Sequence, residues 1–274
     1  SNTRHTATAV ATIADVTSTA GANSGNKIYG NTISNVNMGI AFIGSGTAAN
    51  QDTGNDVGGS SAATGNTITN WGGAAAVSGY VSNSGTSYCI FMNHQVGDNV
   101  SYNTITSATI SGTAVTLRGI FKDYTTTGAT LVGTTNITNN TVTITDNFTS
   151  GTLECIRSQG TVANTSTMNM NSNTILNTSM GGAASTTTIV CLVNSSAWGT
   201  LNQNSNIIRG TTSTATTGGF TGVSNTGAVV TTINQNNNQI GNASGGAITF
   251  SAATSGAVLG INNTGGAATC AYSA

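Results

Sequence analysis

The sequence predicts an all-β chain that folds as one domain, a β-solenoid, and three observations lead to this prediction. A short signature, Asn followed by any residue and then Ile or Val, forms a series of seven at spacings of 35, 37, 37, 33, 33 and 32 residues. Thr, Gly, Asn and Ser make up 152 of the 274 residues, and Pro is absent. No Asn-Gly or Asp-Gly pair occurs, although these pairs are the strongest short signals for a tight hairpin.

The Asn of each signature is the first repeated element. Equivalent residues of neighbouring coils stack about 4.8 Å apart when their strands pair in parallel. Stacked Asn side chains can then hydrogen-bond along a ladder and satisfy turn backbone that would otherwise be buried without partners. The residues expected in this ladder are Asn31, Asn66, Asn103, Asn140, Asn173, Asn206 and Asn238.

The second element is a small residue followed by an aliphatic one, which opens a short apolar run after each Asn signature. We expect the aliphatic residues to fill the interior as a stack of Ile40, Ile90, Ile120, Ile156, Leu192, Val223 and Ile248. A third apolar position precedes the Asn signature and is clearest at Met168, Leu201, Ile233 and Ile261. These stretches are too short and too rich in Thr, Ile and Val to be helices.

The three elements predict three short strands in each coil, paired in parallel with the coils above and below. About seven to eight coils of 32–37 residues are expected within a single domain over residues 1–274. Residues 1–27 form a partial N-terminal coil, residues 28–263 hold the repeats, and residues 264–274 are a C-terminal tail. The absence of Pro agrees with strands that pair along both edges.

The segment IYGNTISNVNMGIAFIGSG, residues 28–46, resembles the pectate-lyase-like right-handed parallel β-helix repeat family. The resemblance extends more weakly over residues 28–263, and the loops are similar to those of Asn/Thr-rich bacterial surface or secreted β-helix proteins. It implies a single-stranded right-handed parallel β-helix that is extracellular or on the cell surface of a bacterium. It implies no activity, because this repeat occurs in lyases, glycosidases, adhesins and phage tailspikes.

The charge content excludes several classes of partner. The chain has 6 basic and 7 acidic residues, so it lacks the basic excess expected of a nucleic-acid-binding surface. No window approaches the roughly 18 apolar residues of a membrane span. We expect no cofactor and no metal, apart from a weak indication of Ca²⁺ near Asp52 and Asp56, whose loop could supply oxygen ligands.

Five of the charged residues come from two neighbouring coils: Arg118, Lys122, Asp123, Glu154 and Arg157. Arg118 and Glu154 occupy the same repeat position and should form an ion pair between coils. In a catalytic interpretation, Asp123 and Glu154 are the paired carboxylates of a saccharide site, with Arg118 and Lys122 beside them. The favoured interpretation is a solvated ladder of salt bridges, worth at most about 1 kcal/mol. Asp98 and His94, on the preceding coil, could join the same face.

Three cysteines, Cys89, Cys155 and Cys191, share one repeat position. Cys155 and Cys191 fall on adjacent coils, where a separation of about 4.8 Å lies within the Cα range of a disulfide. A disulfide and a pair of stacked free thiols are both open, and free thiols are favoured because other coils have Gly or Ala at this position.

The sequence therefore predicts a non-catalytic, extracellular structural solenoid that associates end to end in a filament, fibre or adhesin. One alternative is a polysaccharide-acting enzyme, a lyase or glycosidase, and an extracellular polysaccharide or surface is a further candidate partner. A second alternative is an ice-binding protein, because Thr67/Thr69, Thr104/Thr106 and Thr141/Thr143 align in three successive coils.

Overall fold

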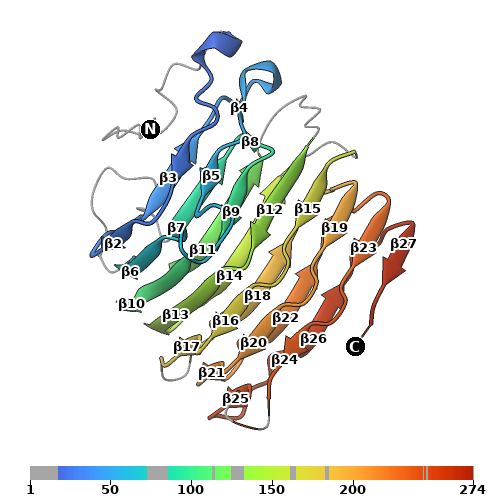
Figure 1. Cartoon of the computed structure of the whole chain (residues 1–274). Helices are drawn as coiled ribbons and strands as arrows, with labels where there is room; N and C mark the ends of the chain where they lie inside the picture. Colours follow the sequence, from blue (N-terminus) through green and yellow to red (C-terminus); the bar gives the residue numbers. More distant parts are fainter. Residues whose placement is uncertain are drawn as a thin grey trace.

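The computed structural model describes residues 18–72, 86–112, 115–124, 133–160, 165–182, 185–242, 244 and 246–273. In these ranges the chain winds as a β-solenoid in which successive coils add strands to three parallel sheets (Figure 1). The helical elements of the described ranges are two short 3-10 helices, η2 (Thr19–Gly21) and η3 (Ala48–Asn50). The predicted all-β parallel solenoid of the right-handed type is confirmed.

Each sheet contains strands from successive coils. Sheet A has the order β1 (Lys27–Ile28), β5 (Asp56–Val57), β9 (Asn99–Ser101), β12 (Thr134–Thr138), β15 (Thr167–Asn169), β19 (Thr200–Asn202), β23 (Thr232–Asn234) and β27 (Thr269–Ala271). Sheet B has β2 (Thr32–Ser34), β6 (Thr67–Trp71), β10 (Thr104–Gly112), β13 (Thr141–Phe148), β16 (Thr174–Leu176), β20 (Ile207–Arg209) and β24 (Gln239–Ile240). Sheet C has β3 (Ile40–Ile43), β7 (Thr86–Asn93), β11 (Val115–Tyr124), β14 (Gly151–Gly160), β18 (Thr188–Asn194), β22 (Phe220–Asn225) and β26 (Val258–Asn263).

Five further strands complete the described coils. β17 (Ser179–Met180), β21 (Thr212–Ser213) and β25 (Thr249–Phe250) extend sheet B, and β4 (Asp52–Thr53) pairs with β8 (Gln95–Val96) in a small separate sheet. The seven stacked strands of sheet C correspond to about six turns of the solenoid, fewer than the predicted seven to eight coils. Residues 1–17 of the predicted partial coil lie outside the described residues.

The interior is filled by stacked aliphatic side chains, as the repeat predicts. In sheet C, Ile40, Ile90, Ile120, Ile156, Leu192 and Val223 follow one another in register. The prediction that Ile248 is the last member of this stack is wrong, because Val223 pairs with Ile261. Ile248 lies between β24 and β25, where it packs against the core. Gly260-Ile261 matches Gly222-Val223, so Ile261 belongs to the second repeated element and not to the third.

The third element therefore continues later in the chain than the sequence indicated. Ile233 pairs with Cys270 on β27, inside the segment predicted to be a tail. Residues 269–271 thus add an eighth strand to sheet A, and the repeat extends past residue 263.

The predicted Asn ladder is confirmed along its whole length. Each ladder Asn donates from its side-chain Nδ2 to Oδ1 of the next, through Asn31, Asn66, Asn103, Asn140, Asn173, Asn206 and Asn238. In six of the seven coils the preceding residue has a positive φ, as in Tyr102 (60°) and Asn139 (58°). This left-handed residue turns the chain sharply from sheet A into sheet B, and the ladder amides satisfy the turn backbone.

Candidate functional site

The predicted ion pair between Arg118 and Glu154 is present on the outer face of sheet C. The two residues are partners in the β11–β14 register, and Arg118 Nε lies 2.5 Å from Glu154 Oε2. Arg157 pairs with the other oxygen, Oε1, so both carboxylate oxygens accept from guanidinium groups. The side chains of Arg118 and Glu154 are only 16% and 6% exposed, so the prediction of a solvated ladder is wrong in this respect.

Aromatic rings explain much of that burial. Tyr88, Phe91 and Phe121 stack on the outer face, with ring centroids 4.9 to 5.4 Å apart. The Arg118 guanidinium lies 4.4 Å from the centroid of Phe121, within the range of a cation–π contact. Phe91 and Phe121 are 7% and 2% exposed, so the ring faces offer little area for stacking a sugar.

The other two members of the predicted catalytic set separate from each other. Asp123 stays on the outer face, where its carboxylate accepts a 3.5 Å hydrogen bond from Gln159. Lys122 is fully buried inside the solenoid, in an inward row between Met92 and Ser158. The prediction that Lys122 lies beside Asp123 on one face is therefore wrong, because neighbouring residues of a strand point to opposite sides.

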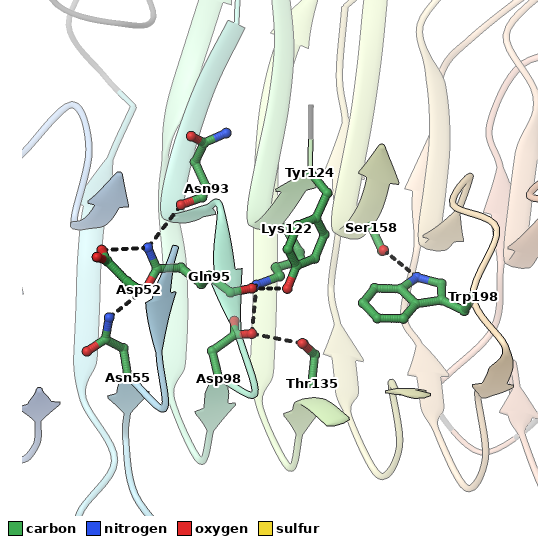
Figure 2. Close-up of polar contacts among 10 residues, drawn as sticks. All are labelled: Asp52, Asn55, Asn93, Gln95, Asp98, Lys122, Tyr124, Thr135, Ser158 and Trp198. Carbon is green, nitrogen blue, oxygen red and sulfur yellow. Dashed lines mark hydrogen bonds and ion pairs between the residues drawn. The ribbon is translucent and has the colours of Figure 1, made fainter. Parts of the chain in front are cut away.

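Inside the solenoid, Lys122 meets a polar cluster that the sequence did not indicate (Figure 2). Its Nζ lies 2.6 Å from Asp98 Oδ1 and donates to the backbone carbonyl of Gln95, also at 2.6 Å. The Tyr124 ring centroid lies 4.2 Å from Nζ, and Thr135 donates to Asp98 Oδ1 at 2.8 Å. The prediction that Asp98 could join the outer face is also wrong, since its side chain is 0% exposed.

Burial dominates the electrostatics of this cluster. It lowers the pKa of Lys122 to about 8, and the negative charge of Asp98 opposes the shift. It also raises the pKa of Tyr124, whose hydroxyl donates to the Gln95 carbonyl. Beyond Tyr124, Trp198 closes the cluster edge-on at 5.8 Å and donates from its indole to Ser158 (Figure 2).

The cluster continues toward the N-terminal coils through side-chain amides. Gln95 donates to Asp52 Oδ2 at 3.1 Å and accepts from Asn55 at 2.6 Å. All three residues are buried. In the sheet A row that contains Asn55, the later positions are Thr135, Met168 and Leu201, so this one row changes from polar to apolar along the solenoid.

Strand alternation is the signal that could have located this cluster. Lys122 follows the core residue Ile120 by two positions, and Asp98 precedes the core residue Val100 by two. Residues two apart share a face of a strand, so both charges point inward. The prediction assigned Lys122 and Asp98 to the outer face because it considered only which coil each charge belongs to, and not the inward and outward alternation along a strand.

A further interior carboxylate, Asp146, is buried on β13 of sheet B and pairs in register with the buried Met180 of β17. One oxygen accepts from the backbone N–H of Phe148 at 3.1 Å, and the other has no hydrogen-bond partner among the described residues. Burial raises the pKa of Asp146 to about 7, against the effect of the Phe148 hydrogen bond.

The cysteines are free thiols. Cys89, Cys155 and Cys191 are buried and Cys270 is exposed. Of the two states that the sequence left open, Cys155 and Cys191 adopt the favoured one, free thiols, and not the disulfide. A hydrogen bond to Cys155 and burial together raise the pKa of the Cys191 thiol well above its usual range.

Asp52 and Asp56 belong to separate hydrogen-bond networks. Asp52 accepts from the backbone N–H of Asn23 and from Gln95, whereas Asp56 accepts from Tyr29, Asn99 and Gly59. Among the described residues no three His, Cys, Asp or Glu side chains gather as a metal site. Asp52 and Asp56 therefore do not share a set of ligands that would support the predicted Ca²⁺ site.

The outer faces of sheets A and B carry rows of Thr and Asn. The predicted alignment of Thr67, Thr104 and Thr141 in sheet B is confirmed. Thr32 and Thr174 extend this row to five coils, and Ile207 then breaks it. Sheet A carries a further Thr row that was not predicted, formed by Thr134, Thr167, Thr200, Thr232 and Thr269. Beside it, Asn136, Asn169, Asn202 and Asn234 form an outer amide ladder.

The last described coil exposes apolar side chains that are buried in the coils before it. Ile261 is 41% exposed, although its partner Val223 is 0% exposed. We call the group of Val258, Leu259, Ile261 and Tyr272 the C-terminal face. These residues belong to β26 and to the segment just after β27, the last strands in the order of sheets C and A.

No family model, curated protein or solved structure matches this chain. The solenoid and its ladder agree with a β-helix repeat, and the pectate-lyase-like family stays a resemblance. In the part of the chain that the structure describes, no helix is long and apolar enough to cross a membrane.

Proposed function

We propose that this protein is a non-catalytic, extracellular structural solenoid of a bacterium that assembles end to end into a filament, fibre or adhesin. The observation that carries the proposal is the C-terminal face. Burying apolar area contributes about 25 cal/mol per Å², and an exposed strand edge is a template for pairing with another chain. A face that combines both features favours association.

The occupant that fits this face is the first coil of a second copy. Among the described residues, the three sheets begin with β1, β2 and β3, and β26 and β27 are the last strands of sheets C and A at the opposite end. Strands at both ends run in the same direction, because every described pairing between coils is parallel. Contact between unlike ends is heterologous, so it propagates as an open filament instead of closing as a dimer. Near-neutral net charge, formally -1, opposes association only weakly.

The test is sedimentation velocity over a wide concentration range with two matched variants. Ile261→Lys places a charge on the C-terminal face and should reduce association at least tenfold. Thr67→Lys adds the same charge to the exposed outer face of sheet B and should leave association unchanged. Wild-type protein that stays monomeric at the highest concentration would refute the proposal, as would equal effects of both variants.

The polysaccharide-acting alternative has less support. Both oxygens of Glu154 are held by Arg118 and Arg157, and Lys122 is buried away from Asp123. A polysaccharide-degrading activity that disappears in Asp123→Ala and Glu154→Ala variants would favour the enzyme instead.

Ice binding is a second candidate because Thr rows lie in register on two outer faces. Regular Thr hydroxyls about 4.8 Å apart along a flat sheet can order water. The sheet A row spans five coils, Thr134 to Thr269. Thermal hysteresis that is lost in Thr200→Lys would support this candidate, and its absence in the wild type would exclude it.

A further inference from the structure

A lysine and an aspartate meet inside the solenoid at bonding distance, out of contact with solvent. Lys122 Nζ lies 2.6 Å from Asp98 Oδ1, and both side chains are 0% exposed. Bringing two charges into an interior carries a large desolvation cost for each ion. The flanking residues of the Lys122 row, Met92 and Ser158, are neutral.

The two oxygens of Asp98 have different surroundings. Oδ1 accepts from Lys122 and from the Thr135 hydroxyl, which lies at 2.8 Å. Oδ2 is buried and has no hydrogen-bond partner among the described residues. The two donors to Oδ1 polarise the Cγ–Oδ1 bond, whereas Oδ2 is not held by a hydrogen bond from the described residues. In a condensation with an amine, Oδ1 would stay as the carbonyl oxygen and Oδ2 would leave.

We propose that Lys122 and Asp98 become joined by an isopeptide bond. A proton first passes from the Lys122 ammonium to the Asp98 carboxylate, which gives a neutral amine and a neutral acid. Nζ then attacks Cγ, the Nζ–Cγ bond forms, and the Cγ–Oδ2 bond breaks. Oδ2 leaves as water with its own proton and one proton from Nζ. Atoms and electrons balance without an oxidant, a reductant or a further reactant.

Three features of the site favour this reaction. Burial holds the pKa of Lys122 near 8, so the neutral amine is accessible near neutral pH. Two reacting groups that a fold fixes beside each other, such as this amine and this carboxyl group, reach effective molarities of about 10⁵ to 10⁸ M. This is far above the concentration of the water that would hydrolyse the amide bond. The amide product carries no charge, so the penalty of two buried ions disappears.

The bond would join two sheets across the solenoid interior. Asp98 immediately precedes β9 of sheet A, and Lys122 belongs to β11 of sheet C. The bond can form whether or not copies associate end to end, because both residues lie inside one chain.

The chain offers a simple test, because Lys27 and Lys122 are its two lysines. The full-length protein is denatured and digested with a protease that cleaves after lysine, and the masses of the intact chain and of the fragments are measured. A linked chain is lighter by one water and is cut after Lys27 alone, because an acylated lysine is not cleaved. The expected fragments are residues 1–27 and 28–274.

Fragments 28–122 and 123–274 at their unmodified masses would overturn the proposal. A loss of water with normal cleavage after Lys122 would also overturn it, because it indicates dehydration within one residue, such as an aspartyl succinimide. The Asp98→Asn variant should lose ammonia instead of water and stay resistant at Lys122, and Lys122→Arg should show neither loss. Thr135→Val removes the hydroxyl donor to Asp98 Oδ1 and keeps the Lys122–Asp98 pair. It should lower the fraction of chains that carry the bond.

Discussion

Asn103 and Asn140 show how one coil holds the next. Asn103 donates to Oδ1 of Asn140 from its backbone N and from its side-chain Nδ2, both at 3.0 Å. Asn140 Nδ2 donates in turn to the Val100 carbonyl at 2.8 Å. One amide therefore satisfies groups on the coil before it and continues the ladder to the coil after it.

Removing one ladder amide should destabilise the protein strongly. Asn140→Ala leaves the buried N–H groups of Asn103 and the Val100 carbonyl without these partners, and each unpaired buried group costs about 1–3 kcal/mol. We expect a loss of about 3 kcal/mol or more in the free energy of unfolding, measured by denaturant titration. Asn169→Ala, in the outer amide ladder, is the matched control and should lose less than about 1 kcal/mol. Equal losses would show that the inner ladder has no special weight.

Asp146 should make stability depend on pH. Its pKa is raised from 3.8 to about 7 in the folded chain, so the folded state binds the proton more tightly than the unfolded state. The contribution of Asp146 to the free energy of unfolding is fully present below about pH 4 and is lost as the pH rises to about 7. It amounts to at most about 4 kcal/mol, at roughly 1.4 kcal/mol for each pKa unit.

Urea titrations between pH 4 and 8 measure this effect. Asp146→Asn keeps an acceptor for the Phe148 N–H and should flatten the decline, whereas Asp123→Asn on the outer face should leave it unchanged. A wild-type profile that rises from pH 4 to 7, with no response to Asp146→Asn, would contradict the assignment.

Thiol labelling should separate Cys270 from the other cysteines. Reactivity requires an accessible thiolate, and burial raises the pKa of Cys89 well above its usual range. An exposed-thiol reagent should modify one of the four cysteines in the native protein and all four after denaturation. Cys270→Ser should remove the native signal. Only two reactive thiols in the denatured, unreduced protein would indicate a Cys155–Cys191 disulfide.

The outer ion pairs should stabilise the chain more than ordinary surface pairs do. Glu154→Gln leaves Arg118 and Arg157 close together without their shared carboxylate, so a loss of about 1–3 kcal/mol is expected, partly recovered at high salt. Asp123→Asn on the same face provides the control and should change stability by less than about 0.5 kcal/mol. A Glu154→Gln loss no larger than this control would indicate that the pairs contribute little.

Periodicity predicted the fold because the repeat is one-dimensional. A constant spacing places Asn66 beside Asn103 and Ile90 beside Ile120 whatever the loops contain. It failed at Ile248 and Ile261, because the last coil carries a longer segment between the Asn signature and the apolar run. Two segments, Ala247-Ile248 and Gly260-Ile261, fit the small-then-aliphatic pattern. The repeat spacing alone favoured the earlier one, which is not the equivalent position.

The candidate site was predicted less well, for a physical reason. Arg118 and Glu154 could be paired from the repeat, since they occupy equivalent positions of adjacent coils. Lys122 and Asp98 belong to one coil and meet across the interior, so coil-to-coil alignment carries no information about them. The burial of Phe121 against Arg118 likewise depends on side-chain packing that the repeat does not encode.

Electron microscopy of the concentrated protein, combined with fibre diffraction, is the strongest test of end-to-end assembly. We expect unbranched filaments with a strong reflection near 4.8 Å along the filament axis, because each copy continues the coil stack of the previous one. The Ile261→Lys variant should form none. Monodisperse single particles at every concentration, or filaments without that axial reflection, would contradict end-to-end assembly.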